Sequence, residues 1–463
     1  MNAINAGSVT VKRNTTHDMF NPTQLSKILG TLTEQLNFCV AYSGGLDSHV
    51  LLHAMCAIAS EHPAINVRAI HINHGLNPNA DAWAQHCCRV CENLGVEFIA
   101  CALNLAVKPG DSVEAVARTA RYECFANLLQ PGENLITAHT QNDQAETLLL
   151  QLLRGSGVKG LAAMPIKKTF AHGYLLRPVL TFTREALQEY ANAHALQWIE
   201  DDSNLALRFD RNYIRHEIMP TLRTRWPQAL TTLSRAAEHC AESAALLDQL
   251  ADMDLKWVSD EFNKALLISA LTQLSAQRQR NVLRRWIVLQ GHQAPNAKHV
   301  QQILATILYA SADAQPQLRW DNLEMRRYQD RLYLMALLPR HDATQIIPWD
   351  LTTPLTLPSS LGKLTAQTVT NYGISAALNG ANITVRFRQG GERCRPVGRK
   401  ETHALKKLFQ DWEIPPWQRD RVPLIYADDT LIAVVGYCVC ANYAAQQNQK
   451  GYDIVYSTVN ELR

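Results

Sequence analysis

One short polar segment constrains the fold more than any other part of the sequence. Ser43-Gly44-Gly45-Leu46-Asp47-Ser48 follows the apolar run Phe38–Tyr42, which predicts a buried strand, and precedes His49–Met55, which predicts a helix. Backbone N–H groups at a Gly-Gly turn can approach an oxyanion closely, and the dipole of the following helix favours negative charge. A Gly-Gly turn alone is more often structural, but this context, with two serine hydroxyls, predicts a nucleotide phosphate site.

Asp47 is an unusual residue for a phosphate site, unless a divalent cation lies between it and the phosphates. The Gly-Lys-Ser/Thr ending of the Walker loop is absent, so this is a phosphate loop of another kind. We predict that Asp47 is the metal ligand and that the whole segment binds the nucleotide, through Ser43, Gly44, Gly45, Leu46, Asp47 and Ser48.

Strands and helices alternate through the first half of the chain. Strands are predicted at 38–42, 65–72, 96–103 and 134–138, and helices at 24–36, 49–59, 81–94, 112–129, 142–154 and towards 195. This alternation indicates a parallel sheet covered on both faces, whose ligands bind at the carboxyl ends of the strands. Two further polar clusters stand at such ends: His71–Gly75, where His71 and Asn73 are candidate nucleotide contacts, and the residues from His139 onward.

The cluster after His139 places two carboxylates on one predicted helix face. Asp143 and Glu146 are three residues apart at the start of that helix. They could bind an ammonium group or a metal, and one of them could act as a base. The simpler interpretation is an acidic first turn that complements the helix dipole, but the expected position opposite the phosphate loop favours a functional role.

Two arginine pairs also have helical spacing. Arg118 and Arg121 are three apart, and Arg211 and Arg215 are four apart. Arg118 and Arg121 could hold phosphates of a nucleotide or of a polynucleotide, although surface arginines are more often only solvated. We predict that Arg211 and Arg215 contact RNA.

The composition is that of an ordinary globular protein: 463 residues, 47% hydrophobic, 19% charged, with a net charge of +3. Such a small charge gives no whole-protein attraction for nucleic acid, so an RNA site must be a local patch. No apolar run approaches the ~20 residues of a membrane span, and we recognise no secretory signal. We therefore expect a cytoplasmic protein without membrane contact, whose 11 cysteines are reduced. Cys88 and Cys91 form a C-x-x-C within a predicted helix, where we expect packing rather than a metal or redox role.

The predicted fold class is α/β, with a Rossmann-like parallel-sheet domain, a helical middle domain and a small α+β C-terminal domain. The boundaries we predict are a loose extension over 1–22, a catalytic domain over 23–225, a helical domain over 226–315, and a hairpin with the C-terminal domain over 316–463. The hairpin is expected within 325–334.

The C-terminal part contains a basic patch. Residues 384–421 hold ten Lys and Arg against five Asp and Glu. Interleaved aromatic residues suit base stacking, but they serve equally well as the core of a small domain. The basic residues are therefore the better RNA candidates: Arg386, Arg388, Arg393, Arg395, Lys406, Lys407, Arg419 and Arg421.

Ser43–Ser48 resembles the pyrophosphatase loop of the ATP-pyrophosphatases that adenylate their substrates. Together with His71–Gly75, Ala117–Tyr122 and Ala138–Thr147, it is similar to the tRNA(Ile)-lysidine synthetase family. Further similar segments are Leu153–Leu161, Trp198–Asn204 and Arg211–Arg215. The resemblance covers roughly residues 36–225, and the basic C-terminal block resembles the C-terminal domain of the long form, which implies contact with the tRNA acceptor stem.

The resemblance implies a reaction and a set of partners. ATP, with Mg²⁺, would adenylate the C2 oxygen of the wobble cytidine in tRNA(Ile) bearing a CAU anticodon, and the ε-amine of L-lysine would then displace AMP. A homodimer is compatible with the family.

The resemblance also implies residue roles. Asp47 would engage Mg²⁺, and Arg118 and Arg121 would support the phosphates or the adenylated base. Asp143 and Glu146 would hold the lysine ammonium, with Asp143 the first and His139 the second candidate for the base. Asn142 departs from the family, because many members have an aspartate there, and this weakens any mechanism that needs two adjacent carboxylates.

Two alternatives remain open from the sequence. A tRNA thiolase of the same superfamily would use sulfide after adenylation and would need cysteines at the strand ends, where only Cys101 and Cys124 are near and neither forms a pair in the sequence. A tRNA-binding protein with a degenerate loop is the other alternative; the intact Asp47 and the two carboxylates argue against it.

Overall fold

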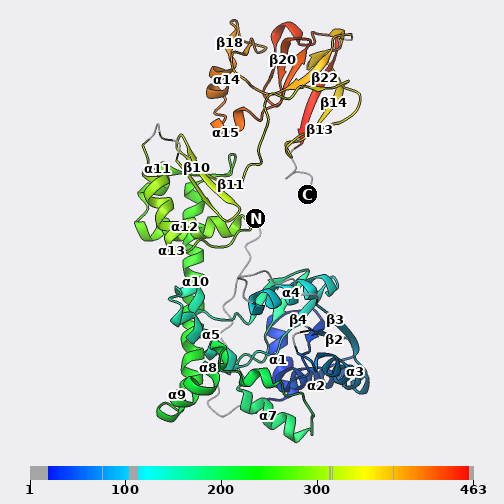
Figure 1. The fold of residues 1–463 in the computed structure, drawn as a ribbon, viewed down its shortest axis with the longest axis vertical. Helices are drawn as coiled ribbons and strands as arrows, with labels where there is room; N and C mark the ends of the chain where they lie inside the picture. Colours follow the sequence, from blue (N-terminus) through cyan, green and yellow to red (C-terminus); the bar gives the residue numbers. More distant parts are fainter. Residues whose placement is uncertain are drawn as a thin grey trace. The chain divides into compact units, whose positions relative to one another are not determined.

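The computed structural model describes residues 19–73, 75, 77–103, 113–311, 314, 316–378 and 380–457. Contacts within the chain divide it into two units, Met1–Asp248 and Gln249–Arg463 (Figure 1). Most of the predicted 1–22 extension lies outside the described residues. The four-part division of the chain stays a prediction.

The first unit is built on a six-stranded sheet of order β3-β2-β1-β4-β6-β5. All neighbours pair in parallel except β5 and β6, which confirms the predicted parallel α/β fold. The strands are β1 (Asn37–Ala41), β2 (Asn66–Asn73), β3 (Glu97–Ala102), β4 (Glu133–Ile136), β5 (Lys167–Phe170) and β6 (Gly173–Leu176). The helices before and between them are α1 (Pro22–Leu32), α2 (Leu46–Glu61), α3 (Ala80–Leu94), α4 (Val113–Leu128), α5 (Gln141–Leu153), α6 (Val158–Leu161) and α7 (Arg184–Ala193).

Both faces of this sheet are covered, and alternating residues of β1 contact different helices. Phe38 and Val40 pack in the core that includes Leu51 and Met55 of α2. Cys39 packs instead in the core that includes Phe125 of α4. Burial on both faces explains why β1 is an unbroken apolar run rather than an alternating one.

The sheet order fixes where a ligand can bind. β1 lies between β2 and β4, so the chain leaves β1 towards one side of the sheet and returns on the other. Such a switch point opens a crevice at the carboxyl ends of the two strands. The phosphate loop follows β1, and the segment from His139 follows β4, so both flank this crevice.

A helical segment closes the first unit beyond the sheet. It comprises η1 (Asp202–Leu205), α8 (Asp210–Tyr213), the π-helical turn η2 (Ile214–Ile218), α9 (Met219–Arg225) and the start of α10 (Ala229–Val258). Ala145 of α5 packs with Ile214, Met219 and Leu230. This small core places the segment against the first turns of α5.

The second unit begins with the rest of α10 and a five-stranded sheet of order β7-β8-β11-β10-β9. Its strands are β7 (Ser259–Asp260), β8 (Ala265–Leu267), β9 (Gln317–Trp320), β10 (Leu323–Tyr328) and β11 (Arg331–Ala336), and its helices are α11 (Ile268–Gln273), α12 (Ala276–Leu289), α13 (Ala297–Gln302) and the π-helical turn η3 (Ile303–Leu308). The antiparallel pairing of β10 with β11 confirms the predicted hairpin.

The C-terminal part holds two further sheets, of order β12-β16-β19-β20-β21 and β13-β14-β22-β15, and a β17-β18 pair. The strands are β12 (Ile347–Pro348), β13 (Leu355–Leu357), β14 (Gly362–Thr370), β15 (Ile374–Ser375), β16 (Ile383–Arg386), β17 (Arg393–Cys394), β18 (His403–Ala404), β19 (Leu424–Ala427), β20 (Thr430–Val434), β21 (Cys438–Val439) and β22 (Lys450–Ser457). The helical pieces are η4 (Ala376–Leu378), α14 (Leu405–Asp411), α15 (Pro416–Arg419) and η5 (Ala441–Tyr443). Phe387 and Phe409 are buried in core clusters, so these two aromatics belong to the core.

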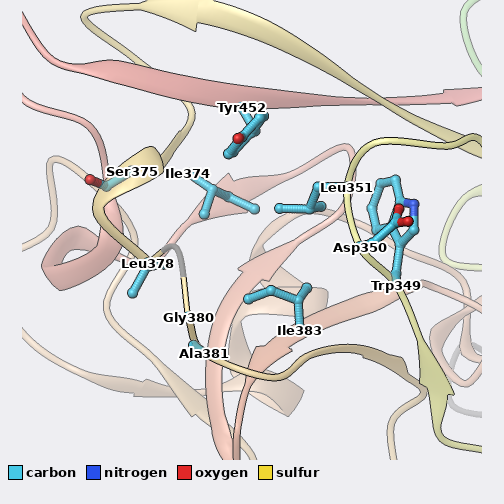
Figure 2. A pocket seen from close by; sticks show the side chains of 10 residues that line it. All are labelled: Trp349, Asp350, Leu351, Ile374, Ser375, Leu378, Gly380, Ala381, Ile383 and Tyr452. Atoms are coloured by element: carbon cyan, nitrogen blue, oxygen red, sulfur yellow. The ribbon is translucent and has the colours of Figure 1, made fainter.

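A cavity of about 120 Å³ lies in this C-terminal part, with Leu351, Ile374 and Ile383 among its lining residues (Figure 2). It contains none of the predicted site residues.

Within the described part of the chain, no helix has the length and apolar character needed to cross a membrane. All 11 cysteines are free thiols in the structure.

Candidate active site

The phosphate loop joins β1 to α2 in a conformation that only glycine accommodates at Gly44. Its φ is +82°, and a Cβ at this position would lie 2.6 Å from Cδ1 of Ile199 and 2.8 Å from Sγ of Cys87. The two serine hydroxyls are 3.0 Å apart, and that of Ser48 donates to the carbonyl oxygen of Gly45 at 2.9 Å. The loop is therefore preorganised before any ligand arrives.

Asp47, in the first turn of α2, is half-buried, with its side chain 29% exposed. Its Oδ1 is shielded from solvent and has no hydrogen-bond partner among the described residues. Nε of Arg184 lies 4.0 Å from this oxygen. Burial raises the pKa of Asp47 to about 6, with Arg184 acting in the opposite direction. A half-buried, incompletely paired carboxylate beside a phosphate loop has the chemistry of a ligand for a hard cation.

Asp143 and Glu146 are near neighbours, as predicted, but both are already engaged by arginines. Nη2 of Arg211 lies 2.7 Å and Nη2 of Arg215 3.1 Å from Oδ1 of Asp143. Nε of Arg211 donates to Oε2 of Glu146 at 2.9 Å, and Nε of Arg215 donates to Oε1 at 2.7 Å. The carboxylates are 13% and 3% exposed. We call these four residues the carboxylate–arginine cluster.

The cluster unites residues to which the sequence analysis gave separate roles. The two carboxylates were expected to hold lysine, and the two arginines to hold RNA. Formally the cluster is neutral, with two negative and two positive side chains. Asp143 also lies in the first turn of α5, as the simpler interpretation expected, and in addition its Oδ2 accepts the backbone N–H of Thr140 at 2.8 Å, which caps the helix.

Neither candidate base is strong in this arrangement. Burial would raise the pKa of Asp143, but Arg211, His139 and the hydrogen bond from Thr140 lower it, and the net shift is downward. Burial lowers the pKa of His139 to about 3, and its Nδ1 is 2.8 Å from the hydroxyl of Thr137. His139 is thus a neutral imidazole at physiological pH.

His71 and Asn73 stand at the end of β2, as predicted. Nδ1 of the buried His71 donates to the carbonyl oxygen of Tyr42 at 3.0 Å, which leaves Nε2 as an acceptor. Asn73 donates to Asp81 at 2.9 Å and accepts the backbone N–H of Gly75 at 2.8 Å. Both side chains therefore shape the rim of the crevice.

Arg118 and Arg121 lie on α4 beside the ring of Tyr122, with guanidinium carbons 5.4 and 5.5 Å from its centre. Burial lowers the pKa of Arg121.

A third arginine, Arg177, was missed by the sequence analysis. It is buried directly after β6 and donates to the carbonyl oxygen of Pro165 at 2.7 Å, and its Nε has no hydrogen-bond partner within the part of the chain that the structure describes.

Ligands of a parallel sheet bind at the carboxyl ends of its strands. Arg177 would therefore have been a candidate if the sequence had predicted β6. β6 has only four residues, too few for a clear apolar pattern. Arg177, Arg121 and Arg211 all act on the pKa of His139, so the end of β4 lies in a strongly basic environment that suits phosphate.

A cavity of about 310 Å³ adjoins the carboxylate–arginine cluster. Its lining combines three arginines and a carboxylate with apolar and amide side chains: Asn142, Glu146, Arg184, Arg215, Met219, Pro220, Arg223 and Leu230. The oxygen of the Asn142 side chain accepts the backbone N–H of Arg184 at 3.0 Å, so Asn142 caps α7 and adds no charge here. Within the described residues, no group of three or more His, Cys, Asp or Glu could hold a metal ion.

The predicted RNA contacts of the second unit differ in how far the fold uses them. Arg386 donates to the carbonyl of Asp428 at 2.6 Å, and Arg419 donates to the hydroxyl of Tyr328 at 3.0 Å. Arg388, Arg395 and Arg421 also have partners within this unit, in Asp420, Asn442 and Pro339. Arg393, Lys406 and Lys407 are exposed, and Arg393 also donates to the carbonyl oxygen of Thr402 at 3.4 Å. Their exposure suits contact with a phosphate backbone.

The two cysteines that bear on the thiolase alternative are closer than the sequence suggested. The thiols of Cys101 and Cys124 are hydrogen-bonded. Burial, and to a lesser extent the neighbouring thiol of Cys101, raises the pKa of Cys124 to about 12. A thiol with such a pKa stays protonated at neutral pH and is a poor nucleophile.

Comparison with known families agrees with this arrangement. Residues 17–222 match the model of the PP-loop domain, 266–333 that of the TilS substrate binding domain, and 383–456 that of the TilS substrate C-terminal domain. The chain is 53% identical to a tRNA(Ile)-lysidine synthase of Coxiella burnetii, over 94% of this chain and 96% of that protein.

Two further relatives carry the same name. They come from Methylococcus capsulatus, at 45% identity over 86% of this chain and 90% of the relative, and from Proteus mirabilis, at 41% over 89% and 93%. The match includes all three of these domains and nearly the full length of the relatives, and the chain belongs to the tRNA(Ile)-lysidine synthase family.

Proposed function

We propose that the protein attaches L-lysine to C2 of the wobble cytidine of tRNA(Ile) with a CAU anticodon, and converts ATP to AMP and pyrophosphate. The relatives named above support the reaction. The observation that carries the site is the preorganised phosphate loop with the incompletely paired Asp47, beside the carboxylate–arginine cluster. The product tRNA reads AUA and accepts isoleucine instead of methionine.

In the first step the C2 oxygen of the cytidine attacks the α-phosphorus of ATP, and the bond to the bridging oxygen of pyrophosphate breaks. Backbone N–H groups of the loop and the hydroxyl of Ser48 bind the pyrophosphate. Asp47 would hold Mg²⁺, which neutralises charge on the leaving group when bound. Arg121 and Arg177 stabilise the charge that develops on the transferred phosphoryl group.

In the second step the lysine ε-amine attacks C2, the bond from C2 to the adenylated oxygen breaks, and AMP leaves. The ε-ammonium must first reach Asp143 and Glu146, whose oxygens are held by Arg211 and Arg215. We propose that phosphates of the bound anticodon loop draw the two arginines away and so open the carboxylates to lysine. This exchange reconciles both predicted roles, because each arginine passes from a carboxylate to a phosphate.

The same exchange bears on the proton that the ammonium must lose. Once Arg211 has left, the pKa of Asp143 rises, because Arg211 is a main cause of its depression. Asp143 then becomes a better proton acceptor than it is in the paired state. Binding of the RNA thus makes Asp143 more basic.

The expected site of action is the cytoplasm, where tRNA is modified. A homodimer stays a prediction.

Lysine transfer to tRNA tests the proposal. The protein is incubated with Mg²⁺-ATP, radiolabelled lysine and tRNA(Ile) bearing CAU, and acid-insoluble label is counted. We expect lysine-dependent label that Asp47→Ala abolishes. Exchange of pyrophosphate into ATP without lysine transfer would favour another nucleophile, with sulfide tested next, and binding of tRNA with neither activity would favour a binding protein.

A further inference from the structure

We propose that Cys394, Cys438 and Cys440 form a thiol site at which hydrogen peroxide joins Cys394 to Cys440 in a disulfide. All three cysteines are free thiols in the structure and belong to the second unit. No step of the proposed reaction uses them, so the inference is independent of the lysine-transferring activity.

The three sulfur atoms converge although they come from separate segments of the chain. Sγ of Cys394 lies 2.7 Å from Sγ of Cys440 and 3.8 Å from Sγ of Cys438. Cys394 ends β17, Cys438 begins β21, and Cys440 precedes η5. A disulfide bond is about 2.0 Å long, so the bond between Cys394 and Cys440 needs only a small approach of the two sulfurs.

The backbone segments that carry these two cysteines are already held side by side. The N–H of Ala441 donates to the carbonyl oxygen of Arg395 at 2.7 Å, and Pro396 and Cys440 form an antiparallel bridge. Closure of the disulfide therefore requires adjustment of side chains, while the hydrogen-bonded segments keep their places.

Hydrogen bonds within the site make Cys394 the nucleophile. The thiols of Cys438 and Cys440 bond to Sγ of Cys394, and these two bonds lower the pKa of Cys394 against the opposing effect of burial. The same contacts with Cys394, together with burial, raise the pKa of Cys438 and of Cys440. The thiolate is the reactive form of cysteine, so oxidation starts at Cys394.

Access to the site selects a small oxidant. Cys394 and Cys440 are 2% and 5% exposed, and Cys438 is half-buried. Such burial hinders a bulky disulfide reagent more than it hinders hydrogen peroxide, which is why we name hydrogen peroxide as the oxidant.

The reaction balances in two steps. The Cys394 thiolate attacks one oxygen of hydrogen peroxide, the O–O bond breaks, and the leaving hydroxide takes up the proton that Cys394 released; the products are a sulfenic acid and water. Sγ of Cys440 then attacks Sγ of Cys394, the S–O bond breaks, and hydroxide leaves with the thiol proton of Cys440 as a second water. Two thiols and one peroxide thus give one disulfide and two waters.

The disulfide prevents a more damaging outcome. Without a second thiol, another peroxide would carry the sulfenic acid of Cys394 to a sulfinic acid, which is irreversible and places a charge in the core. Cys394 is flanked by Arg393 and Arg395, both predicted RNA contacts. Cys440 therefore protects a segment that the proposed function would use.

Peroxide treatment of the full chain, followed by alkylation and mass analysis of tryptic peptides, tests the proposal. In the unaltered protein at neutral pH we expect the peptide Cys394–Arg399 to be joined to Val422–Lys450, and a thiol reductant to reverse the link. Because Cys438 and Cys440 share one peptide, variants identify the partner. In Cys438→Ala the link persists, whereas in Cys440→Ala it forms about tenfold more slowly or less, and sulfinic acid accumulates at Cys394.

Cys240→Ala is the matched control, because Cys240 is a half-buried cysteine of α10 in the first unit, and its link forms at the rate of the unaltered protein. Far-UV circular dichroism checks the fold of each reduced variant, and Cys440→Ser replaces Cys440→Ala if that spectrum changes. Cys394 that stays free while other thiols react, or that bonds to any cysteine except Cys438 or Cys440, overturns the site. Equal rates in Cys440→Ala and the unaltered protein overturn the assignment of Cys440.

Discussion

At the scale of the residue, we propose that Asp47 serves the reaction and at the same time lowers the stability of the folded protein. A half-buried carboxylate whose pKa is raised to about 6 destabilises the folded protein whenever it is ionised. We predict that Asp47→Asn abolishes lysine transfer yet stabilises the protein, measured at pH 7.5 without Mg²⁺ or ATP. The expected gain is about 1–3 kcal/mol, read from urea unfolding of the first unit.

The pH dependence of this gain has a definite sign. The folded pKa lies above the unfolded value of 3.8, so the cost of ionisation starts to appear near pH 4, grows as the pH rises, and is complete above about 6. The advantage of Asp47→Asn must therefore shrink between pH 7.5 and pH 5. An advantage that is absent at pH 7.5, or equal at both pH values, would contradict this account.

At the scale of the element, we propose that the ion pairs between the first turn of α5 and the turn η2 are replaced by contacts with RNA phosphates when tRNA binds. We predict that lysine binds weakly to the protein alone, and at least about tenfold more tightly when an anticodon stem-loop is present, since RNA competes for the arginines. Equilibrium dialysis with labelled lysine measures this coupling. In Arg211→Ala/Arg215→Ala the carboxylates are open from the start, so lysine binds without RNA.

Arg235→Ala, exposed on α10, is the control and keeps the RNA dependence of the unaltered protein. If lysine binds equally well with and without the stem-loop in every form, the exchange of arginines is wrong. The double variant also unfolds more easily, because Glu146 is 3% exposed and loses its cationic partners.

At the scale of the whole molecule, we predict that each of the two units contributes its own charged side chains to the recognition of tRNA. Lys406 and Lys407 are exposed on α14, whose other face buries Leu405, Leu408 and Phe409, so the fold does not depend on them. We predict that Lys406→Ala/Lys407→Ala weakens binding of full-length tRNA(Ile) and lowers the slope of log Kd against log salt by about 1–2. Binding of the isolated anticodon stem-loop stays the same.

Lys298→Ala, exposed on α13 outside the basic segment, should leave both affinities unchanged. Equal losses for the full tRNA and the stem-loop would mean that α14 does not recognise the acceptor end.

The strands and helices of the first sheet could be predicted well, because the sequence patterns that indicate them lie within short segments of the chain. Apolar runs, glycine turns and alternating elements are readable within about 15 residues, and β1, α2 and the β10–β11 hairpin appear where they were expected. The pairing of Arg215 with Asp143 joins residues 72 apart, and no local pattern encodes it. Arg184 and Arg223 were missed for the same reason, since they line a cavity that only the fold creates, whereas Arg177 was missed because β6 is too short to be predicted.

The π-helical turn that carries Arg215 has a consequence for how this site could be lost or gained. A π-turn accommodates one residue more than an α-turn, and Ile214–Ile218 is such a turn between two α-helical ones. Each residue of an α-helix advances the direction of its side chain by about 100°. Deletion of a single residue here would let the chain run on as an ordinary helix and would turn α9, with Arg223, away from its present direction. The register of one turn thus couples the position of Arg215, which is paired with the two carboxylates, to the direction of α9.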